Sequence, residues 1–245
     1  MKTHIGVAAC QVPEVRENTA AALSLIEKYA ERAGIAGARL VCFPECFLQG
    51  YLVEEELARR NAIDLTSAAF SDLLRRLANA KPALVFGMIE ADAGSLFNTA
   101  VVVDGGRLIG KYRKMHPLPG ESIYRPGTLC PVFEAGGLTF GINICSDTRY
   151  PETAAAVAAQ GARLIVCPSN NMMRRQNAEK WKHRHNETRA CRAKETGLWL
   201  ISSDVTGIRS DSVGLGPTCV IDPDGSVVAQ VPLMEVGMVV VKISN

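Results

Sequence analysis

The chain has 245 residues, of which 47% are hydrophobic and 21% charged, and its formal net charge is +2. This is the composition of an ordinary globular protein, and so small a charge gives no reason to expect nucleic acid or an acidic membrane surface as a partner. No apolar run is long enough to cross a bilayer and no signal-type segment begins the chain. We therefore expect a cytoplasmic protein that does not associate with membranes.

The eight cysteines do not suggest a disulfide framework. No Cys-x-x-Cys pair occurs, and most of the cysteines lie in apolar, strand-like contexts, where cysteine behaves as a small buried hydrophobe. We expect a reduced protein in which seven of the eight are structural. His183 and His185 could ligate a metal, but on a helix they point to different faces. We expect neither a metal site nor a cofactor.

The first half of the chain alternates helical and β-type patterns. In chain order we expect a strand at 4–10, a helix at 17–34, a strand at 39–43, helices at 53–61 and 67–79, and strands at 83–90, 96–103 and 107–112. The first helix has Leu23, Ile26 and Ala30 on one side. The glycines of Asp104-Gly105-Gly106 indicate a hairpin turn between the last two strands.

The second half begins with an irregular segment at 113–130, which contains three prolines and is long enough to be functional. We then expect a hairpin at 131–134 and 138–144, a helix at 152–160, a strand at 163–167, a helix at 175–196, a strand at 198–203, a polar loop at 204–216, and strands at 217–221, 227–231 and 237–243. There is no repeat or linker, so one domain is expected. Alternating elements with hairpins favour a mixed sheet, or two packed sheets, with helices outside.

Cys145 is the best candidate for a nucleophile. An apolar run over 138–144 ends at this cysteine, and a polar turn leads into the helix at 152–160. A strand, a sharp turn and a helix are how many α/β enzymes present a nucleophile. A thiol is mostly protonated at neutral pH and needs a base or a nearby positive charge. The alternative interpretation is a structural cysteine at the end of a strand.

Two segments offer partners for this thiol. Glu45 directly follows a buried strand and a proline, and burial would raise its pKa into the range of a general base. The alternative is an acidic residue at the start of a helix. Any of Lys111, Arg113 and Lys114 could point inward from the end of the strand at 107–112, and spacing alone does not choose among them. A solvated basic strand end is the other interpretation.

Four segments carry motifs in a fixed order. They are 43–45 (Phe-Pro-Glu), 111–116 (Lys-Tyr-Arg-Lys-Met-His), 144–152 (Ile-Cys-Ser-Asp-Thr-Arg-Tyr-Pro-Glu) and 189–195 (Arg-Ala-Cys-Arg-Ala-Lys-Glu). Two weaker pieces are Glu121 with the Pro-Gly pair at 126–127, and the strand and turn at 216–225. Together the pieces resemble the nitrilase superfamily, the carbon–nitrogen hydrolases, in its amidase-like branch. The resemblance covers nearly the whole chain.

The resemblance implies an α/β fold, a four-layer αββα sandwich, as a single carbon–nitrogen hydrolase domain over residues 1–245. It implies a Glu45, Lys114 and Cys145 triad, and it selects Lys114 because the family's lysine stands two residues before the histidine. Glu121 would orient Lys114 and the substrate. The resemblance also implies a homodimer or higher homo-oligomer, with the helices at 152–160 and 175–196 at the interface.

The expected function is hydrolysis of a small amide or N-carbamoyl compound to an acid and ammonia or an amine. Glu45 would act as base, Cys145 would form a thioester, and Lys114 with the Ser146 backbone N–H would hold the oxyanion. The residues expected to bind the substrate are Tyr51, Ser146, Asn170, Asn171 and Met172.

This chain departs from its relatives beside these residues. Ser146 stands where many amidase-like members have tyrosine and true nitrilases usually have Trp-Glu, and residues 170–173 lack the tryptophan that many relatives place nearby. The departures leave the chemistry intact and the substrate open. Alternatives are a nitrilase with the same triad, a catalytically silent binding member of the fold, and a redox sensor that uses Cys145.

Overall fold

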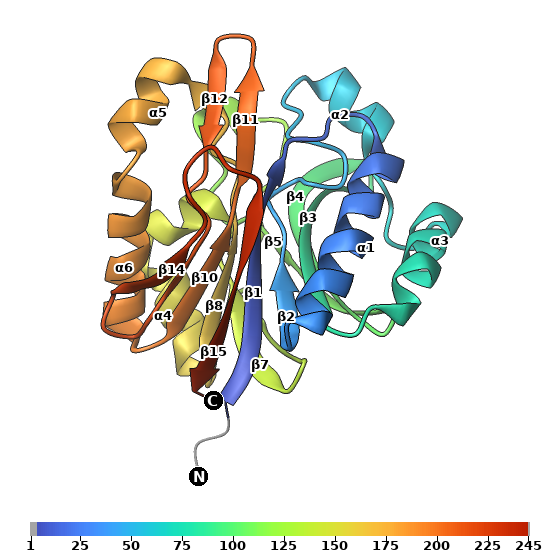
Figure 1. The fold of residues 1–245 in the computed structure, drawn as a ribbon. Coiled ribbons are helices and arrows are strands. Elements are labelled where there is room, and N and C mark those ends of the chain that lie inside the picture. The colour runs from blue at the N-terminus through green and yellow to red at the C-terminus, as the bar shows by residue number, and fades with distance from the viewer. Residues whose placement is uncertain (1–3, 245) are drawn as a thin grey trace.

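The protein is described by a computed structural model that covers residues 4–244. Two mixed β-sheets pack against each other, and helices cover the outer face of each, which gives four layers (Figure 1). This confirms the expected αββα sandwich. The described residues include no helix that is both long and apolar enough to cross a membrane. Within the same range, His, Cys, Asp and Glu side chains form no cluster of three or more that could hold a metal.

The first sheet is built around the N-terminal strand, which pairs in parallel with β2 and β11 and antiparallel with β15. Its main path runs β5-β4-β3-β2-β1-β11-β12-β9. The strands are β1 (His4–Pro13), β2 (Ala38–Cys42), β3 (Ala83–Asp92), β4 (Ser95–Asp104), β5 (Arg107–Arg113), β9 (Met173–Arg174), β11 (Val205–Arg209), β12 (Ser212–Leu215) and β15 (Gly237–Ser244).

The second sheet runs in the order β14-β13-β10-β8-β7-β6. Its strands are β6 (Val132–Ala135), β7 (Leu138–Ile142), β8 (Leu164–Pro168), β10 (Trp199–Ser203), β13 (Cys219–Ile221) and β14 (Val227–Gln230). Strands β7, β8 and β10 run parallel, so their carboxyl ends meet at one edge. Strand β7 leads to Cys145 and β8 leads to Ser169, so this edge positions the site.

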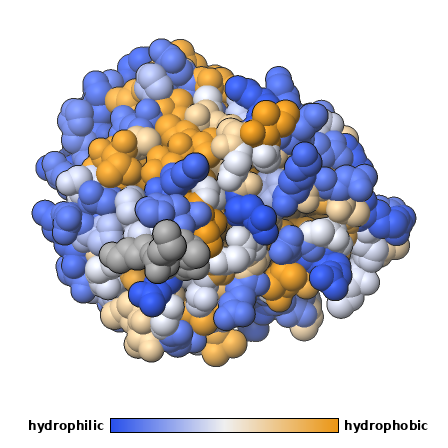
Figure 2. Space-filling model, turned by 60° about the horizontal axis from the view of Figure 1, so that its bottom comes forward, coloured by the Kyte–Doolittle hydropathy of each residue, from blue (hydrophilic) through white to orange (hydrophobic). Residues whose placement is uncertain are grey.

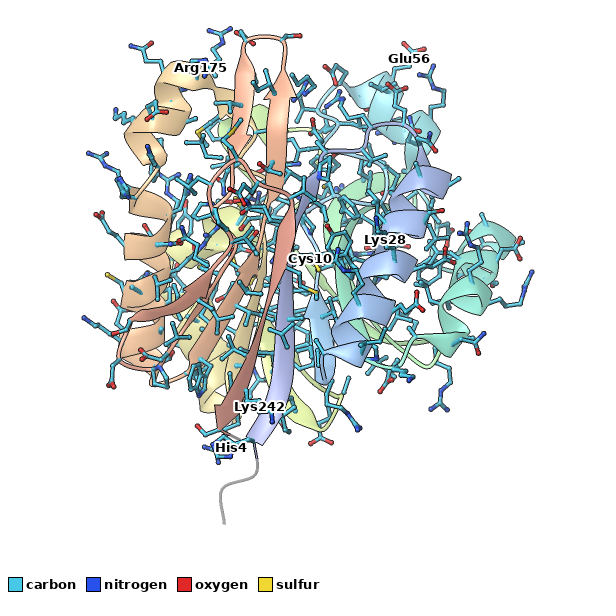
Figure 3. All side chains as sticks on the ribbon, in the orientation of Figure 1. His4, Cys10, Lys28, Glu56, Arg175 and Lys242 are labelled. Atoms are coloured by element: carbon cyan, nitrogen blue, oxygen red, sulfur yellow. The ribbon has the colours of Figure 1, made fainter. Side chains whose placement is uncertain are left out.

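Helices α1 (Thr19–Ile35), α2 (Glu55–Asn61) and α3 (Ala68–Arg76) belong to one outer layer, and α4 (Pro151–Ala159), α5 (Arg175–Trp181) and α6 (Arg184–Thr196) to the other (Figure 1). Helix α1 begins after Asn18, whose side chain accepts a hydrogen bond from the Ala21 N–H at 3.0 Å. Figure 3 shows Cys10 pointing into the molecule from β1, whereas Lys28 and Glu56 extend outward from helices α1 and α2.

The core has one layer between the sheets and one beneath each helical layer. Strand β1 serves two of them because alternate side chains face opposite sides: Val7 and Ala9 lie between the sheets, while Ala8 and Cys10 pack toward α1. The sandwich end where β1 begins has a mixed surface, in which hydrophilic residues interrupt the apolar patches (Figure 2).

Three sequence predictions differ from the structure. The expected helix at 175–196 is two helices, α5 and α6, and Trp181 and His185 stack across the break at 5.5 Å between ring centroids. The expected loop at 204–216 contains the hairpin β11–β12, in which Ile208 pairs with Val213. The glycine and serine residues of this segment hid its strand character. All eight cysteines are free, but Cys191 is exposed rather than buried in the core.

Candidate active site

Glu45 lies three residues beyond the end of β2 and is fully buried. Its Oε1 accepts hydrogen bonds from Lys114 Nζ and Asn98 Nδ2, both at 2.7 Å. Its Oε2 accepts one from the backbone N–H of Asn170 at 3.0 Å. Burial raises the pKa of this carboxyl to about 7, although the Lys114 charge opposes the rise. The side chain can therefore exchange a proton near neutral pH.

Lys114 follows the last residue of β5 and is also almost fully buried. Its ammonium group lies 2.9 and 2.8 Å from the two carboxylate oxygens of Glu121, in addition to its contact with Glu45. Burial opposes its charge, but the neighbouring carboxylates outweigh that penalty and raise the pKa of Lys114. Lys114 is therefore a buried cation that contacts the carboxyl groups of both Glu45 and Glu121.

The structure separates Lys114 from the other two basic residues near the end of β5. Lys111 and Arg113 both contact the carboxylate of Glu90, which is buried on strand β3. Arg113 also lies over the ring of Phe97 at 3.6 Å. Lys111 and Arg113 therefore belong to a separate ion-pair cluster, and only Lys114 points toward Glu45.

Asn98 is a member of this buried group that sequence reasoning missed. It lies on β4, and its side-chain NH₂ donates to Glu45 at 2.7 Å and to Glu121 at 3.1 Å. Its backbone carbonyl accepts the N–H of Lys114 at 2.9 Å. The available signal was a polar amide in an otherwise apolar strand segment, which is rarely buried without a partner.

Cys145 begins a short 3₁₀ turn, Cys145–Arg149, after strand β7. Its φ of 44° lies in the left-handed region, which is uncommon for a residue with a side chain and frequent at functional sites. The residue is partly exposed and lines a cavity of about 230 Å³. Burial raises the pKa of the thiol, the Glu45 charge raises it further, and Lys114 lowers it. Cys145 is consequently a thiol in the resting protein.

Asp147 joins the Cys145 turn to the segment after β5. Its fully buried carboxylate accepts hydrogen bonds from the Tyr112 hydroxyl at 2.8 Å, the His116 N–H at 2.8 Å and the Ile144 N–H at 3.0 Å. These bonds connect the chain on either side of Lys114 with the chain on either side of Cys145. The sequence shows an aspartate in a turn, and only the fold shows what it joins.

The five residues expected to bind the substrate do not all lie in the cavity. Ser146 and Asn171 line it, and the Ser146 hydroxyl donates to the His116 carbonyl at 2.7 Å. Tyr51 instead hydrogen-bonds Glu121, and burial raises its pKa. Asn170 offers its N–H to Glu45, and Met172 lies near Gly214 on β12. Neither Tyr51, Asn170 nor Met172 is among the described residues that line the cavity.

Sequence reasoning also missed most of the cavity wall. The remaining lining residues are Leu118, Thr148, Arg149, Met173, Asn177, Trp181, His185, Thr188 and Arg189. Many of them come from α5 and α6, whose arrangement depends on the break that the sequence did not indicate. The guanidinium of Arg149 lies 5.2 Å from the centre of the Trp181 ring. Burial, together with the nearby Arg189 and Arg149 charges, lowers the pKa of His185 to about 3, so this imidazole is neutral.

Asn171 connects the cavity to a second buried ion pair. Its backbone N–H donates to Asp204 Oδ1 at 2.9 Å, its side-chain NH₂ donates to Asp204 Oδ2, and its Oδ1 lies 3.9 Å from Cys145 Sγ. Arg189 Nη2 lies 3.7 Å from Asp204 Oδ2. Burial raises the pKa of Asp204 to about 6, while Arg189 opposes the rise, so this carboxylate is ionised at neutral pH.

Comparison with known proteins agrees with this geometry. The model of the family "Carbon-nitrogen hydrolase" matches residues 6–245. The chain therefore belongs to the carbon–nitrogen hydrolases of the nitrilase superfamily.

Among solved structures, an amidase from Nesterenkonia sp. superposes with a TM-score of 0.83 at 26% identity, covering 100% of this chain and 92% of that one. A variant of the Nesterenkonia sp. AN1 amidase, with the acetamide moiety of fluoroacetamide added covalently at its active site cysteine, gives a TM-score of 0.86 at 25% identity and covers 99% and 91% of the two chains.

Curated relatives have several activities. A glutamine-dependent NAD(+) synthetase from Rhodobacter capsulatus is 30% identical over 83% of this chain and 37% of its own length. A nitrilase from Pyrococcus abyssi is 36% identical over 61% of this chain and 59% of its own. An (R)-stereoselective amidase from Pseudomonas sp. is 30% identical over 82% of this chain and 72% of its own length. The matches to the first two span less than two thirds of those proteins.

Proposed function

We propose that this protein hydrolyses a small amide or N-carbamoyl compound through a thioester on Cys145, with Glu45 and Lys114 completing a catalytic triad. The observation that carries the proposal is the buried contact between Glu45 and Lys114 at 2.7 Å. The charges of both residues act on the thiol of Cys145, which lines a cavity. Family membership supports carbon–nitrogen bond hydrolysis.

The first step is removal of the thiol proton. Because the pKa of Cys145 is raised, a thiolate forms only when a base takes the proton as the sulfur attacks. Glu45 suits this role because a carboxyl with a pKa of about 7 is partly ionised at neutral pH and is a stronger base than an ordinary carboxylate. The sulfur then bonds to the carbonyl carbon, and the carbonyl π electrons move to oxygen.

The second requirement is a partner for that oxyanion. The Lys114 ammonium and the Ser146 backbone N–H, which lies in the first turn after Cys145, are the donors we assign. A donor that is positioned in advance contributes about 3–4 kcal/mol to lowering such a barrier. Glu121 holds Lys114 in place through both carboxylate oxygens, which keeps the donor charged and oriented.

The intermediate then collapses to products. Glu45 returns its proton to the leaving nitrogen as the carbon–nitrogen bond breaks, and ammonia or an amine departs. A water molecule that gives its proton to Glu45 attacks the thioester, and Cys145 leaves as the acid is released. Each proton taken by Glu45 is returned within one turnover, so no other titrating group is needed.

We assign an amide rather than a nitrile substrate on two grounds. The amidases of Nesterenkonia sp. and Pseudomonas sp. match most of this chain. The residues after Cys145 are Ser-Asp, without the Trp-Glu pair of nitrilases. Because the Pyrococcus abyssi relative is a nitrilase, nitrile hydrolysis is the competing hypothesis, and the substrate screen described below includes nitriles.

We also propose that the protein forms a homodimer or higher homo-oligomer through α4 and α6. Helix α4 has small exposed side chains at Ala155 and Ala159, which would let a second helix approach closely. Sedimentation equilibrium at micromolar concentration tests this proposal, and a species with the 26.4 kDa mass of one chain would contradict it.

The deciding experiment is an ammonia-release screen over primary amides, N-carbamoyl compounds and nitriles, with Cys145→Ala and Cys145→Ser as controls. We expect turnover of at least one amide or carbamoyl compound, and loss of that turnover in both variants without loss of folding. Near-normal turnover by Cys145→Ala would exclude the thioester mechanism. Activity on nitriles alone would reassign the protein as a nitrilase.

A further inference from the structure

The amide group of Asn171 is held in one orientation. Asp204 accepts both the backbone N–H and the side-chain NH₂ of this residue. The reverse orientation would place Asn171 Oδ1 against a carboxylate oxygen, and two acceptors repel each other. The bond to Asp204 therefore leaves Oδ1, which can only accept hydrogen bonds, beside Cys145 Sγ at 3.9 Å in the wall of the cavity.

Asp204 is itself firmly anchored. It is fully buried, its Oδ1 also accepts the Val205 N–H at 2.9 Å, and its own N–H donates to Thr218 Oγ1 at 2.9 Å. Arg189, which lies 3.7 Å away, is held by the Pro217 carbonyl at 2.8 Å. The orientation of the Asn171 side chain is thus determined by its buried partner Asp204, which lies between β10 and β11, and does not depend on what occupies the cavity.

This arrangement has a consequence during the reaction. In the resting protein the Cys145 thiol can donate its S–H to Asn171 Oδ1. When Glu45 takes that proton as the sulfur attacks, Oδ1 loses its donor and faces an electron-rich sulfur. Because Asn171 is buried, an Oδ1 atom beside an electron-rich sulfur is unfavourable unless another donor replaces the proton. A substrate N–H can do so.

We propose that Asn171 Oδ1 accepts a hydrogen bond from the N–H of the scissile amide, and that Asn171 thereby selects substrates with a hydrogen on the scissile nitrogen over nitriles and esters. The inference rests on the proposed amidase function and names the chemical class of its substrate. A nitrile and an ester have no hydrogen on the atom that replaces the amide nitrogen, so both leave Oδ1 without a donor.

The test compares a primary amide with the methyl ester of the same acid, because both yield the same thioester on Cys145. In Asn171→Ala we expect kcat/KM for the amide to fall about tenfold, the usual effect of one lost hydrogen bond, while kcat/KM for the ester stays within about twofold. Equal losses for amide and ester would assign Asn171 a structural role, and no loss for the amide would remove its role altogether. Either result overturns the proposal.

Two further variants sharpen the comparison. Asn171→Thr keeps a hydroxyl that can donate to Asp204 and accept from the substrate, so part of the amide preference should return. Met173→Leu changes a neighbouring cavity residue without adding or removing a hydrogen-bonding group of comparable strength, so the amide-to-ester ratio should not change.

A second measurement uses the unmodified protein and does not depend on how the variants fold. The rates of Cys145 alkylation by chloroacetamide and by methyl chloroacetate are each divided by the rate of the same reagent with free cysteine. We expect the normalised rate to be higher for chloroacetamide, and equal normalised rates would contradict the proposal. If neither amide nor ester is hydrolysed, the amidase function fails, and the alkylation ratio still decides the role of Asn171.

Discussion

The backbone of Glu45 rests directly on Gly87 of strand β3. A Cβ at Gly87 would lie 2.6 Å from the Glu45 Cα and 2.3 Å from the N of Cys46. The Gly87 N–H also donates to the Pro44 carbonyl at 3.0 Å. Strand β3 therefore positions the backbone of Glu45 by direct contact, and at position 87 only glycine leaves room for that contact.

Gly87→Ala should displace Glu45 and lower kcat at least tenfold, because the new methyl group meets backbone atoms that cannot rotate away. Gly120→Ala is the matched control, since its Cβ would meet nothing within 4 Å. Steady-state kinetics together with thermal unfolding separates the two effects. Wild-type kcat in a folded Gly87→Ala variant would show that the contact does not position the base.

Glu45→Gln should lower kcat by about 10²–10⁴-fold, the usual contribution of a general base. In the unmodified protein kcat/KM should fall as pH drops through about 7, because protonated Glu45 cannot accept the thiol proton. Glu90→Gln is the control, because hydrogen bonds from Arg113 and Lys111 outweigh burial and lower the pKa of Glu90. In Glu90→Gln, kcat/KM should still fall as pH drops through about 7, which is the acid limb of the pH–rate profile. Loss of this limb in Glu90→Gln would show that it does not report the titration of Glu45.

The same shift makes stability depend on pH. The pKa of Glu45 in the folded protein, about 7, lies above its ordinary value of 4.5. Between these values the folded protein retains a proton that the unfolded chain has released. The contribution of Glu45 to the free energy of unfolding therefore falls as pH rises through this interval. Chemical denaturation of wild type and Glu45→Gln at pH 5 and pH 7.5 measures it, and identical pH dependence in the two proteins would contradict this assignment.

Asn98→Ala should shift the acid limb of the pH–rate profile to higher pH. The Asn98 side chain donates to the carboxylate of Glu45, and this hydrogen bond lowers the pKa of Glu45. Its loss should raise that pKa and leave less of the base form at neutral pH. Thr99→Val is the control, because the Thr99 hydroxyl donates to Glu90 and not to Glu45. An unshifted limb in Asn98→Ala would show that Asn98 does not tune the base.

The sequence predicted the parts of the site that follow strong local signals. Glu45 and Cys145 each come just after an apolar strand, and their motifs occur in a recognisable order with that of Lys114. The structure places Glu45 and Lys114 in contact. Asn98 was missed because one polar residue inside a strand does not reveal what it faces.

The cavity wall could not be predicted for a different reason. Trp181 and His185 reach the cavity because the chain breaks between α5 and α6, and the helical pattern across 175–196 is continuous enough to hide that break. The bond between Asn171 and Asp204 joins residues 33 positions apart. The parallel pairing of β8 with β10 brings them together, because Asn171 and Asp204 lie beyond the carboxyl ends of these two strands.

Lys114→Met should be the most disruptive single change at the site. It leaves the carboxylates of Glu45 and Glu121 buried near each other without the cation that both contact. Breaking a buried ion pair in this way costs about 3–5 kcal/mol, and loss of the oxyanion donor should lower kcat at least 100-fold. Because protonation removes the repulsion, the variant should regain stability relative to wild type as pH falls from 8 to 5. Lys111→Met is the matched control, since Glu90 keeps Arg113 as a partner and little change is expected. Thermal unfolding at both pH values measures the difference, and equal melting temperatures for Lys114→Met and wild type at pH 8 would show that the two carboxylates do not need their lysine.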